Sequence, residues 1–121
     1  MKVLIIDDEP LVRRSLTKAF QGRGCECWDA VDGKAGLQLW RQHRPDLVFL
    51  DILMPGLTGP QVLQEIEKEI RDKTKVVMIS AYTGDYNKDT ALKLGADLFI
   101  SKPFDDIFVV VETAQKLLGK S

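Results

Sequence analysis

The sequence predicts an α/β domain in which a parallel sheet is covered by helices on both faces. Short continuous apolar runs at residues 3–6, 47–50 and 76–79 are typical of strands that are buried on both sides. Longer segments with apolar residues at helical spacing lie between them, so strand and helix alternate along the chain. The length of 121 residues fits one compact domain, and we expect residues 1–121 to form it.

The elements are expected at regular intervals. The expected strands are residues 3–6, 25–30, 47–50, 76–79 and 98–100. Helices are expected from Pro10 to a stop at Gly22 and Gly24, and then over residues 35–40, 62–70, 85–94 and 105–118. Pro10 suits a first helical turn, and Asp32 is suited to cap the second helix. Gly95 is expected to end the fourth.

The composition argues against several classes of protein. A formal net charge of -1 provides no basic stripe for nucleic acid. The longest apolar runs, about five residues, are too short to cross a membrane. Acidic residues follow the first apolar run too closely for a signal peptide. We therefore expect a cytoplasmic protein without direct nucleic-acid or membrane partners.

The cysteines and the histidine are expected to be structural. Cys25 and Cys27 would lie on one face of a strand, about 7 Å apart, which is long for a disulfide. Two cysteines also offer too few ligands for a zinc site. His43 has no partner histidine, cysteine or nearby acid, so we expect it at a helix end or on the surface.

Three aspartates follow the first and third expected strands. Asp7 and Asp8 come after one apolar run and Asp51 after the other, so they meet if these strands are neighbours. Two carboxylates about 5 Å apart repel by roughly 3 kcal/mol at an effective dielectric constant of about 20. Such a cluster must hold a cation, raise a pKa or pair with a base. Oxygen ligands favour Mg²⁺. The alternative is that Asp7 and Asp8 only cap the first helix.

Two further polar residues follow the fourth and fifth expected strands. Lys102 can supply a positive charge to an anion, although a surface salt bridge is the alternative. Ser80 offers a hydroxyl, although a serine in this position is usually a turn residue. Acids for a metal, a lysine and a hydroxyl together indicate phosphoryl chemistry. Asp51 is the candidate nucleophile because it leads into a flexible loop, whereas Asp7 and Asp8 are better placed as metal ligands.

With these residues the chain resembles a response-regulator receiver domain of two-component phosphorelays, of the kind that chemotaxis regulators contain. The matching segments are, in order, Ile6-Asp7-Asp8-Glu9, Asp51-Ile52-Leu53-Met54-Pro55-Gly56, Ser80-Ala81, Gly95-Ala96 and Lys102-Pro103-Phe104. Any one segment is weak evidence. The ordered set covers essentially the whole chain at the family's spacing and is highly specific.

The resemblance implies a flavodoxin-like sheet with strand order 2-1-3-4-5, an order that is known for a member of this family. It implies a magnesium site formed by Asp7, Asp8, Asp51 and the backbone carbonyl of Leu53. It implies that Ser80 and Lys102 bind the phosphoryl oxygens of phosphorylated Asp51. It also implies a cis Lys102-Pro103 bond.

The resemblance further implies a switch and partners. Ser80 and Phe99 are the expected switch residues, and Phe99 stands where tyrosine is frequent, so its ring has no hydroxyl group. The partners implied are a histidine kinase or phosphotransfer protein and a downstream effector domain or protein. The protein would be a phosphoacceptor that assists its own phosphorylation, rather than an enzyme.

Two other features bear on signalling. Leu53 and Tyr82 occupy the positions that flank the hydrolytic water, and neither is an amide or an acid, so we expect slow self-dephosphorylation.

In the last helix, Phe108 and Val109 widen the apolar face beyond one core contact. They are either core residues or part of a partner surface, which includes the surface of a phosphorylation-linked homodimer.

Three other classes of protein fit the sequence less well. A flavin-binding flavodoxin-type domain would need a Ser/Thr/Gly-rich phosphate loop after the first strand, where this chain has Asp8-Glu9-Pro10. A haloacid-dehalogenase-type phosphatase would need two aspartates separated by one residue, whereas Asp7 and Asp8 are adjacent. A pseudo-receiver that only binds partners would not need the full set of site residues.

Overall fold

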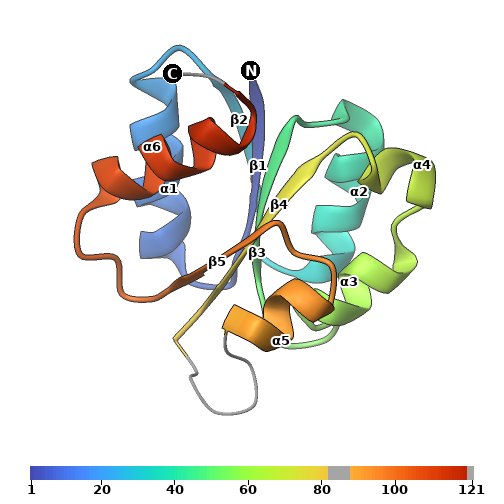
Figure 1. The fold of residues 1–121 in the computed structure, drawn as a ribbon. Helices are drawn as coiled ribbons and strands as arrows, with labels where there is room; N and C mark the ends of the chain where they lie inside the picture. Colours follow the sequence, from blue (N-terminus) through green and yellow to red (C-terminus); the bar gives the residue numbers. More distant parts are fainter. Residues whose placement is uncertain (82–87, 120–121) are drawn as a thin grey trace.

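The fold is built on a parallel sheet at the centre of the chain (Figure 1). The structure is a computed structural model, and it describes residues 1–81 and 88–119. Within these residues the sheet has five parallel strands in the order β2-β1-β3-β4-β5. The strands are β1 (Lys2–Ile6), β2 (Glu26–Ala30), β3 (Leu47–Asp51), β4 (Lys75–Ser80) and β5 (Leu98–Ser101). The predicted fold class and strand order are confirmed.

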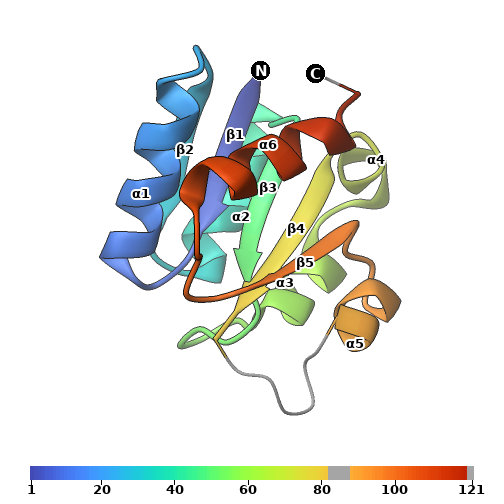
Figure 2. The same cartoon turned by 60° about the vertical axis from the view of Figure 1, so that its left-hand side comes forward.

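Helices cover both faces of the sheet. The helices described are α1 (Pro10–Gln21), α2 (Gly33–His43), α3 (Gly59–Glu65), α4 (Lys68–Arg71), α5 (Lys88–Lys93) and α6 (Ile107–Leu117). In Figure 1, α1 and α6 lie on one face and the other helices on the opposite face. Figure 2 shows α6 crossing in front of the strands, beside α1. No helix in residues 1–81 and 88–119 is long and apolar enough to cross a membrane.

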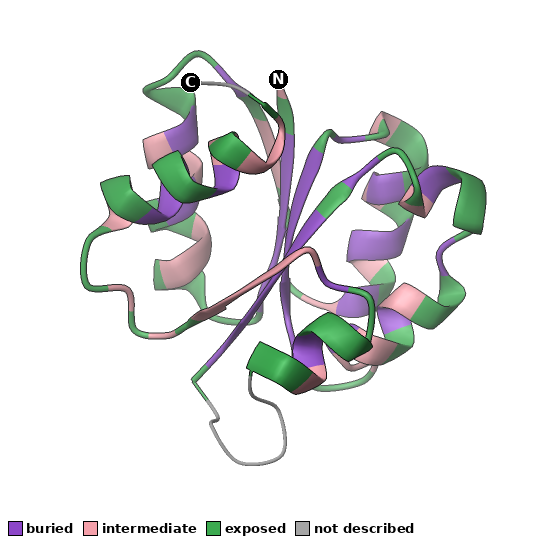
Figure 3. Cartoon of the chain, viewed as in Figure 1, coloured by how far each residue is buried: buried purple, intermediate pink, exposed green. Residues whose placement is uncertain are grey.

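The core is divided into two apolar clusters by the sheet. Because successive side chains of a strand point to opposite faces, Val3 and Ile5 pack toward α1 and α6, whereas Leu4 and Ile6 pack toward α2 and α3. Figure 3 shows the central strands as the most buried part of the chain. This explains why the strand sequences are continuously apolar rather than alternating.

Several predicted helix ends are confirmed. Pro10 lies in the first turn of α1, and the Asp32 carboxylate accepts the Ala35 N–H at 2.8 Å. Gly95, which follows α5, has φ +108°, a conformation that glycine adopts without steric cost. The last helix begins at Ile107 rather than residue 105, because the Asp106 carboxylate accepts the Phe108 N–H and caps it. The predicted start of the fourth helix, residues 85–87, lies outside the described residues.

The single helix predicted over residues 62–70 is wrong, because the chain forms α3 and α4 with a break between them. Ile66 and Glu67 have extended backbones with ψ 137° and 138°. Arg41 of α2 donates to the Glu65 carbonyl at 3.2 Å and pairs with the Glu67 carboxylate. A side chain from another helix thus satisfies a carbonyl at the end of α3. Ile66, which directly follows α3, and Ile70 in α4 both still reach the core.

The remaining structural predictions concern single side chains. Cys25 and Cys27 are free thiols, as expected. His43 ends α2, and its ring stacks on Trp28 with centroids 4.1 Å apart. Phe108 and Val109 are exposed, so neither belongs to the core. The wide apolar face of α6 therefore has one side in the core and one in solvent.

Candidate functional site

The site lies where the carboxyl ends of four neighbouring strands meet. Asp7 directly follows β1 and Asp51 is the last residue of β3, and these two strands are paired. Ser80 ends β4, beside β3, and Lys102 directly follows β5, beside β4. The parallel register therefore brings together residues from opposite ends of the sequence. In open α/β sheets this edge is where ligands bind.

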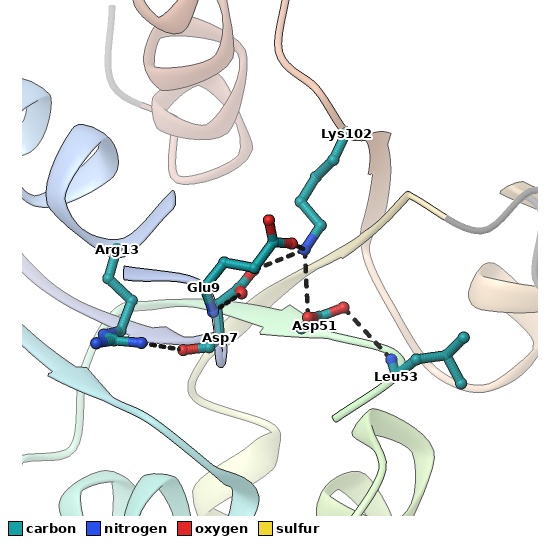
Figure 4. Close-up of polar contacts among 6 residues, drawn as sticks. All are labelled: Asp7, Glu9, Arg13, Asp51, Leu53 and Lys102. Atoms are coloured by element: carbon teal, nitrogen blue, oxygen red, sulfur yellow. Dashed lines mark hydrogen bonds and ion pairs between the residues drawn. The ribbon is translucent and has the colours of Figure 1, made fainter. Parts of the chain in front are cut away.

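Lys102 is at the centre of the site. Its side chain is only 6% exposed, and its ammonium contacts Glu9 Oε1 at 2.6 Å, Asp7 Oδ2 at 3.0 Å and Asp51 Oδ2 at 3.2 Å. Figure 4 shows these carboxylates converging on the Nζ atom. Burial lowers the pKa of Lys102, but the bonds to Glu9 and Asp7 and the charges of Asp51 and Asp7 outweigh it and raise the pKa above its ordinary value. The side chain is therefore a fixed positive charge.

The Asp51 carboxylate lies in surroundings that disfavour its negative charge. It is 3% exposed, and burial together with the charge of Asp7 raises the pKa of Asp51 to about 7, although Lys102 opposes the shift. Its Oδ1 accepts the Leu53 N–H at 3.3 Å, which orients the group (Figure 4). An electron-rich carboxylate beside a fixed ammonium is suited to nucleophilic chemistry.

Asp7 is held more firmly than any capping role would require. It is fully buried, and burial raises its pKa while the Glu9 N–H, which Oδ1 accepts at 2.8 Å, lowers it. Its backbone carbonyl accepts a bond from Arg13 at 2.7 Å (Figure 4). Arg13 in turn pairs with Asp29 of β2 at 2.9 Å. Asp7 thus faces Lys102 and Asp51, so the alternative that it is only a helix cap does not fit the structure.

The acids form a candidate cation site. Carboxylate oxygens of Asp7, Asp8, Glu9 and Asp51 all lie within 4.8 Å of one another. Among the described residues, Lys102 is the cation that pairs with three of these four carboxylates, so the group carries excess negative charge. Hard oxygen donors with uncompensated charge fit Mg²⁺. The side chains Asp8, Glu9, Asp51, Leu53, Ser80, Ala81 and Lys102 line an open hollow of about 300 Å³.

The other predicted residues take different positions. Ser80 is buried at the end of β4, and its carbonyl accepts the Lys102 N–H at 2.9 Å. Phe99 in β5 is half-buried and packs against the core cluster on the α2 and α3 side. Leu53 is 44% exposed at the rim of the hollow. Tyr82 lies outside the described residues. The Lys102–Pro103 bond is cis, as the resemblance implied.

Two residues of the site were missed by the sequence predictions. Glu9 follows Asp7 and Asp8 in the first matching segment, and an acid beside two aspartates was the signal that could have found it. Arg13 had no signal in the sequence, because its contact with the Asp7 carbonyl depends on where α1 sits.

The fold and the site together define a class of α/β proteins with a charged site at the carboxyl edge of a parallel sheet. Its buried acids lie at the ends of the central strands, and its lysine follows the edge strand β5. Comparison with known proteins gives the family: the response regulator receiver domain matches residues 3–112, and the chain belongs to this family. It is the receiver domain of a two-component response regulator. This assignment sets aside the flavodoxin-type and phosphatase-type alternatives.

The relatives and solved structures agree with this assignment. The chain is 39% identical over 103 residues to the probable transcriptional regulator ycf27 of Porphyridium aerugineum, with 85% of this chain and 42% of that protein covered. It is 36% identical to the regulatory protein AtoC of Escherichia coli, with 96% and 25% covered. The chain thus spans less than half the length of these curated relatives.

Solved receiver structures share the whole fold. The receiver domain of NtrX from Brucella abortus superposes with a TM-score of 0.85 at 33% identity, and 98% and 99% of the two chains are covered. The chemotaxis protein CheY4 of Vibrio cholerae gives a TM-score of 0.84 at 27% identity, with 95% and 96% covered.

Proposed function

We propose that Asp51 accepts a phosphoryl group from a phosphohistidine of a histidine kinase or phosphotransfer protein. The observation that carries this proposal is the buried Asp51 carboxylate, 3.2 Å from the Lys102 ammonium at the carboxyl edge of the sheet. A carboxylate oxygen of Asp51 forms the new bond to phosphorus while the phosphorus–nitrogen bond of the donor breaks. The electron pair stays on the imidazole nitrogen. The protein keeps the group and releases no metabolite, so it is a phosphoacceptor rather than an enzyme.

Lys102 stabilises the negative charge on the phosphoryl oxygens. It is already charged and already in place, so no reorganisation is needed as the transition state forms. In phosphoryl transfer, positioning and electrostatic stabilisation supply most of the catalysis. Ser80, buried beside Asp51 at the end of β4, is proposed to bind a second phosphoryl oxygen.

The acids are proposed to hold Mg²⁺. Asp7, Asp8 and Asp51 offer carboxylates, and we assign the backbone carbonyl of Leu53 as a further ligand. The bound ion supplies positive charge that offsets the carboxylates and the incoming phosphoryl group. The excess negative charge of the cluster supports this assignment.

Phosphorylation is proposed to change a protein-binding surface on α5, β5 and α6. The Lys102 N–H donates a hydrogen bond to the Ser80 carbonyl at 2.9 Å. A shift at the end of β4 therefore reaches the end of β5 directly. Phe99 lies in β5 and is half-buried, which leaves its ring room to move. Such a switch biases two arrangements of one surface. The effector, or a second copy of the chain, would bind the favoured arrangement.

The phosphosite is tested by intact-mass measurement after incubation with acetyl phosphate and Mg²⁺. We expect the added mass of one phosphoryl group in the wild type and none in Asp51→Asn. Asp46→Asn is the matched control, because this exposed aspartate accepts the Lys2 N–H at 2.9 Å and asparagine can accept it too. Labelling that survives in Asp51→Asn would contradict the assignment of Asp51 as the phosphoacceptor. Labelling of the wild type in excess chelator would contradict the proposed requirement for Mg²⁺.

A further inference from the structure

Within the described residues, three carboxylates share the Lys102 ammonium. An ammonium has three N–H groups, and its nitrogen lies within hydrogen-bond distance of Asp7, Glu9 and Asp51, which is one N–H for each carboxylate. A phosphoryl oxygen can therefore bind Lys102 only if one carboxylate gives up its place. The three carboxylates differ in how readily they can do this.

Glu9 is the carboxylate that leaves most easily. Asp7 is fully buried and would lose its counter-charge without gaining water, and Asp51 is the acceptor itself. Glu9 has a 55% exposed side chain, so its carboxylate can be rehydrated when Lys102 is withdrawn. Its contact with Lys102 is nevertheless the shortest of the three, at 2.6 Å.

The position of the Glu9 side chain is not explained by its own helix. Glu9 is the N-cap residue of α1, yet within the described chain its side chain makes no capping bond. It turns instead to a lysine 93 residues away in the sequence (Figure 4). Glu9, Ala81 and Lys102 line both the hollow beside Asp51 and a second hollow of about 320 Å³ that extends along α1 and α6. The ion pair thus forms part of the wall between the hollows.

We infer that Glu9 restrains Lys102 in the resting protein and thereby disfavours phosphorylation by small anionic donors. This inference rests on the proposed function. The Glu9 carboxylate occupies the donor that a phosphoryl oxygen needs, and its charge repels an approaching dianion. The cost falls on binding of the donor rather than on the transfer step. A protein donor gains binding energy from contacts beyond the phosphoryl group and offsets this cost, whereas acetyl phosphate has no such contacts and binds more weakly.

The test compares wild type and Glu9→Gln at saturating Mg²⁺. Acetyl phosphate transfers its phosphoryl group to an Asp51 oxygen, and acetate leaves with the electron pair of the broken phosphorus–oxygen bond. Glutamine keeps the size and an accepting oxygen but removes the charge. We expect the KM for acetyl phosphate to fall about two- to fivefold, within the range for loss of one partly exposed ion pair. The maximal rate should change by less than about twofold, because the transfer step is untouched.

Three controls separate restraint from general effects of charge or structure. Glu69→Gln in α4 makes the same change in net charge at the opposite end of the sheet, and it should leave the KM unchanged. Phosphoramidate, a less negatively charged donor, should benefit less from Glu9→Gln than acetyl phosphate does. Glu9→Asp, whose shorter side chain keeps the charge but weakens the contact, should give an intermediate KM. The difference should also shrink at high salt.

The outcomes distinguish this inference from the proposed function. A KM that is unchanged or raised in Glu9→Gln, or a loss of maximal rate, would overturn the proposed restraint by Glu9. The proposed function would still stand if Asp51 is labelled in the wild type. Absence of labelling with both donors in the wild type and in Glu9→Gln, where the restraint is removed, would instead overturn the proposed function.

Discussion

At the residue scale, the site places the proposed nucleophile Asp51, the fixed cation Lys102 and the acids Asp7 and Glu9 in one cluster of direct contacts. Burial and the charge of Asp7 raise the pKa of Asp51, and the acids hold Lys102 protonated, so each charge depends on the others. Single substitutions here change chemistry before they change the fold, because Glu9, Asp8 and Leu53 are exposed at the rim of the hollow.

Leu53 is expected to prolong the phosphorylated state. Its exposed side chain lies beside Asp51 and has no group that can orient a water in line with phosphorus. We expect Leu53→Asn to speed self-dephosphorylation about tenfold, the equivalent of roughly 1.4 kcal/mol in the barrier. The decay of the phosphorylated form is followed by intact mass, with the exposed Val31→Asn as control. Equal decay rates in wild type and Leu53→Asn would show that this position does not set the lifetime.

At the scale of elements, helix α3 packs against the end of the strand that carries Asp51. A Cβ atom at Gly59 would lie 2.6 Å from the Asp51 carbonyl oxygen and 3.0 Å from Ile52 Cα. Gly59 also donates its N–H to the Ile52 carbonyl at 2.8 Å. Glycine is thus needed for the first turn of α3 to approach β3.

Gly59→Ala is expected to disturb the site through the backbone. The clash with main-chain atoms cannot be relieved by a side-chain rotation, so we expect a loss of about 1–3 kcal/mol in the free energy of unfolding. Phosphorylation of Asp51 should slow as well. Gly22→Ala is the control, because its Cβ meets nothing closer than 3.4 Å and its φ of -62° suits any residue. Denaturant unfolding that shows equal stability for the two variants would refute this packing argument.

Helix α6 presents part of its apolar face to solvent. Phe108 is 64% exposed, so Phe108→Glu should leave the melting temperature nearly unchanged. We expect it to weaken self-association or effector binding in the phosphorylated form, or with beryllofluoride as mimic. Sedimentation velocity with and without beryllofluoride measures this, with the exposed Val31→Glu as control. If Phe108→Glu behaves like the control in both states, the exposed face of α6 is not a partner surface.

At the scale of the whole molecule, the buried acids make stability depend on pH. The folded protein holds the Asp51 proton with a pKa of about 7, against 3.8 for an ordinary aspartate. Between these values the folded state binds more protons than the unfolded state, so stability falls as pH rises through this range. The raised pKa of Asp7 acts in the same direction.

Asp51→Asn is therefore expected to stabilise the metal-free protein at pH 8, on the order of 2 kcal/mol. The gain in stability should vanish toward pH 4, where Asp51 in the folded wild type is protonated and therefore as uncharged as the asparagine of the variant. Urea unfolding in chelator across this range measures it, and Asp46→Asn should show no such gain. A variant less stable than wild type at pH 8 would mean that the pairing with Lys102 outweighs burial.

The sequence by itself determined the strands, most helix ends and the three aspartates of the acidic site. Continuous apolar runs are typical of strands buried on both faces, and Pro10 and Asp32 act on their own first turns, so local chemistry suffices there. Asp7, Asp51 and Lys102 were predictable because parallel strands bring their carboxyl ends to one edge.

Tertiary structure alone decided the break between α3 and α4, the contact of Glu9 with Lys102 and the exposure of Phe108. Arg41 stabilises the break from another helix, and Glu9 reaches a lysine 93 residues away. The apolar pattern of α6 is the same whether Phe108 is buried or not, because only the packing of α6 on the sheet and α1 selects the buried side. In each case the deciding partner is distant in sequence, so no local pattern contains it.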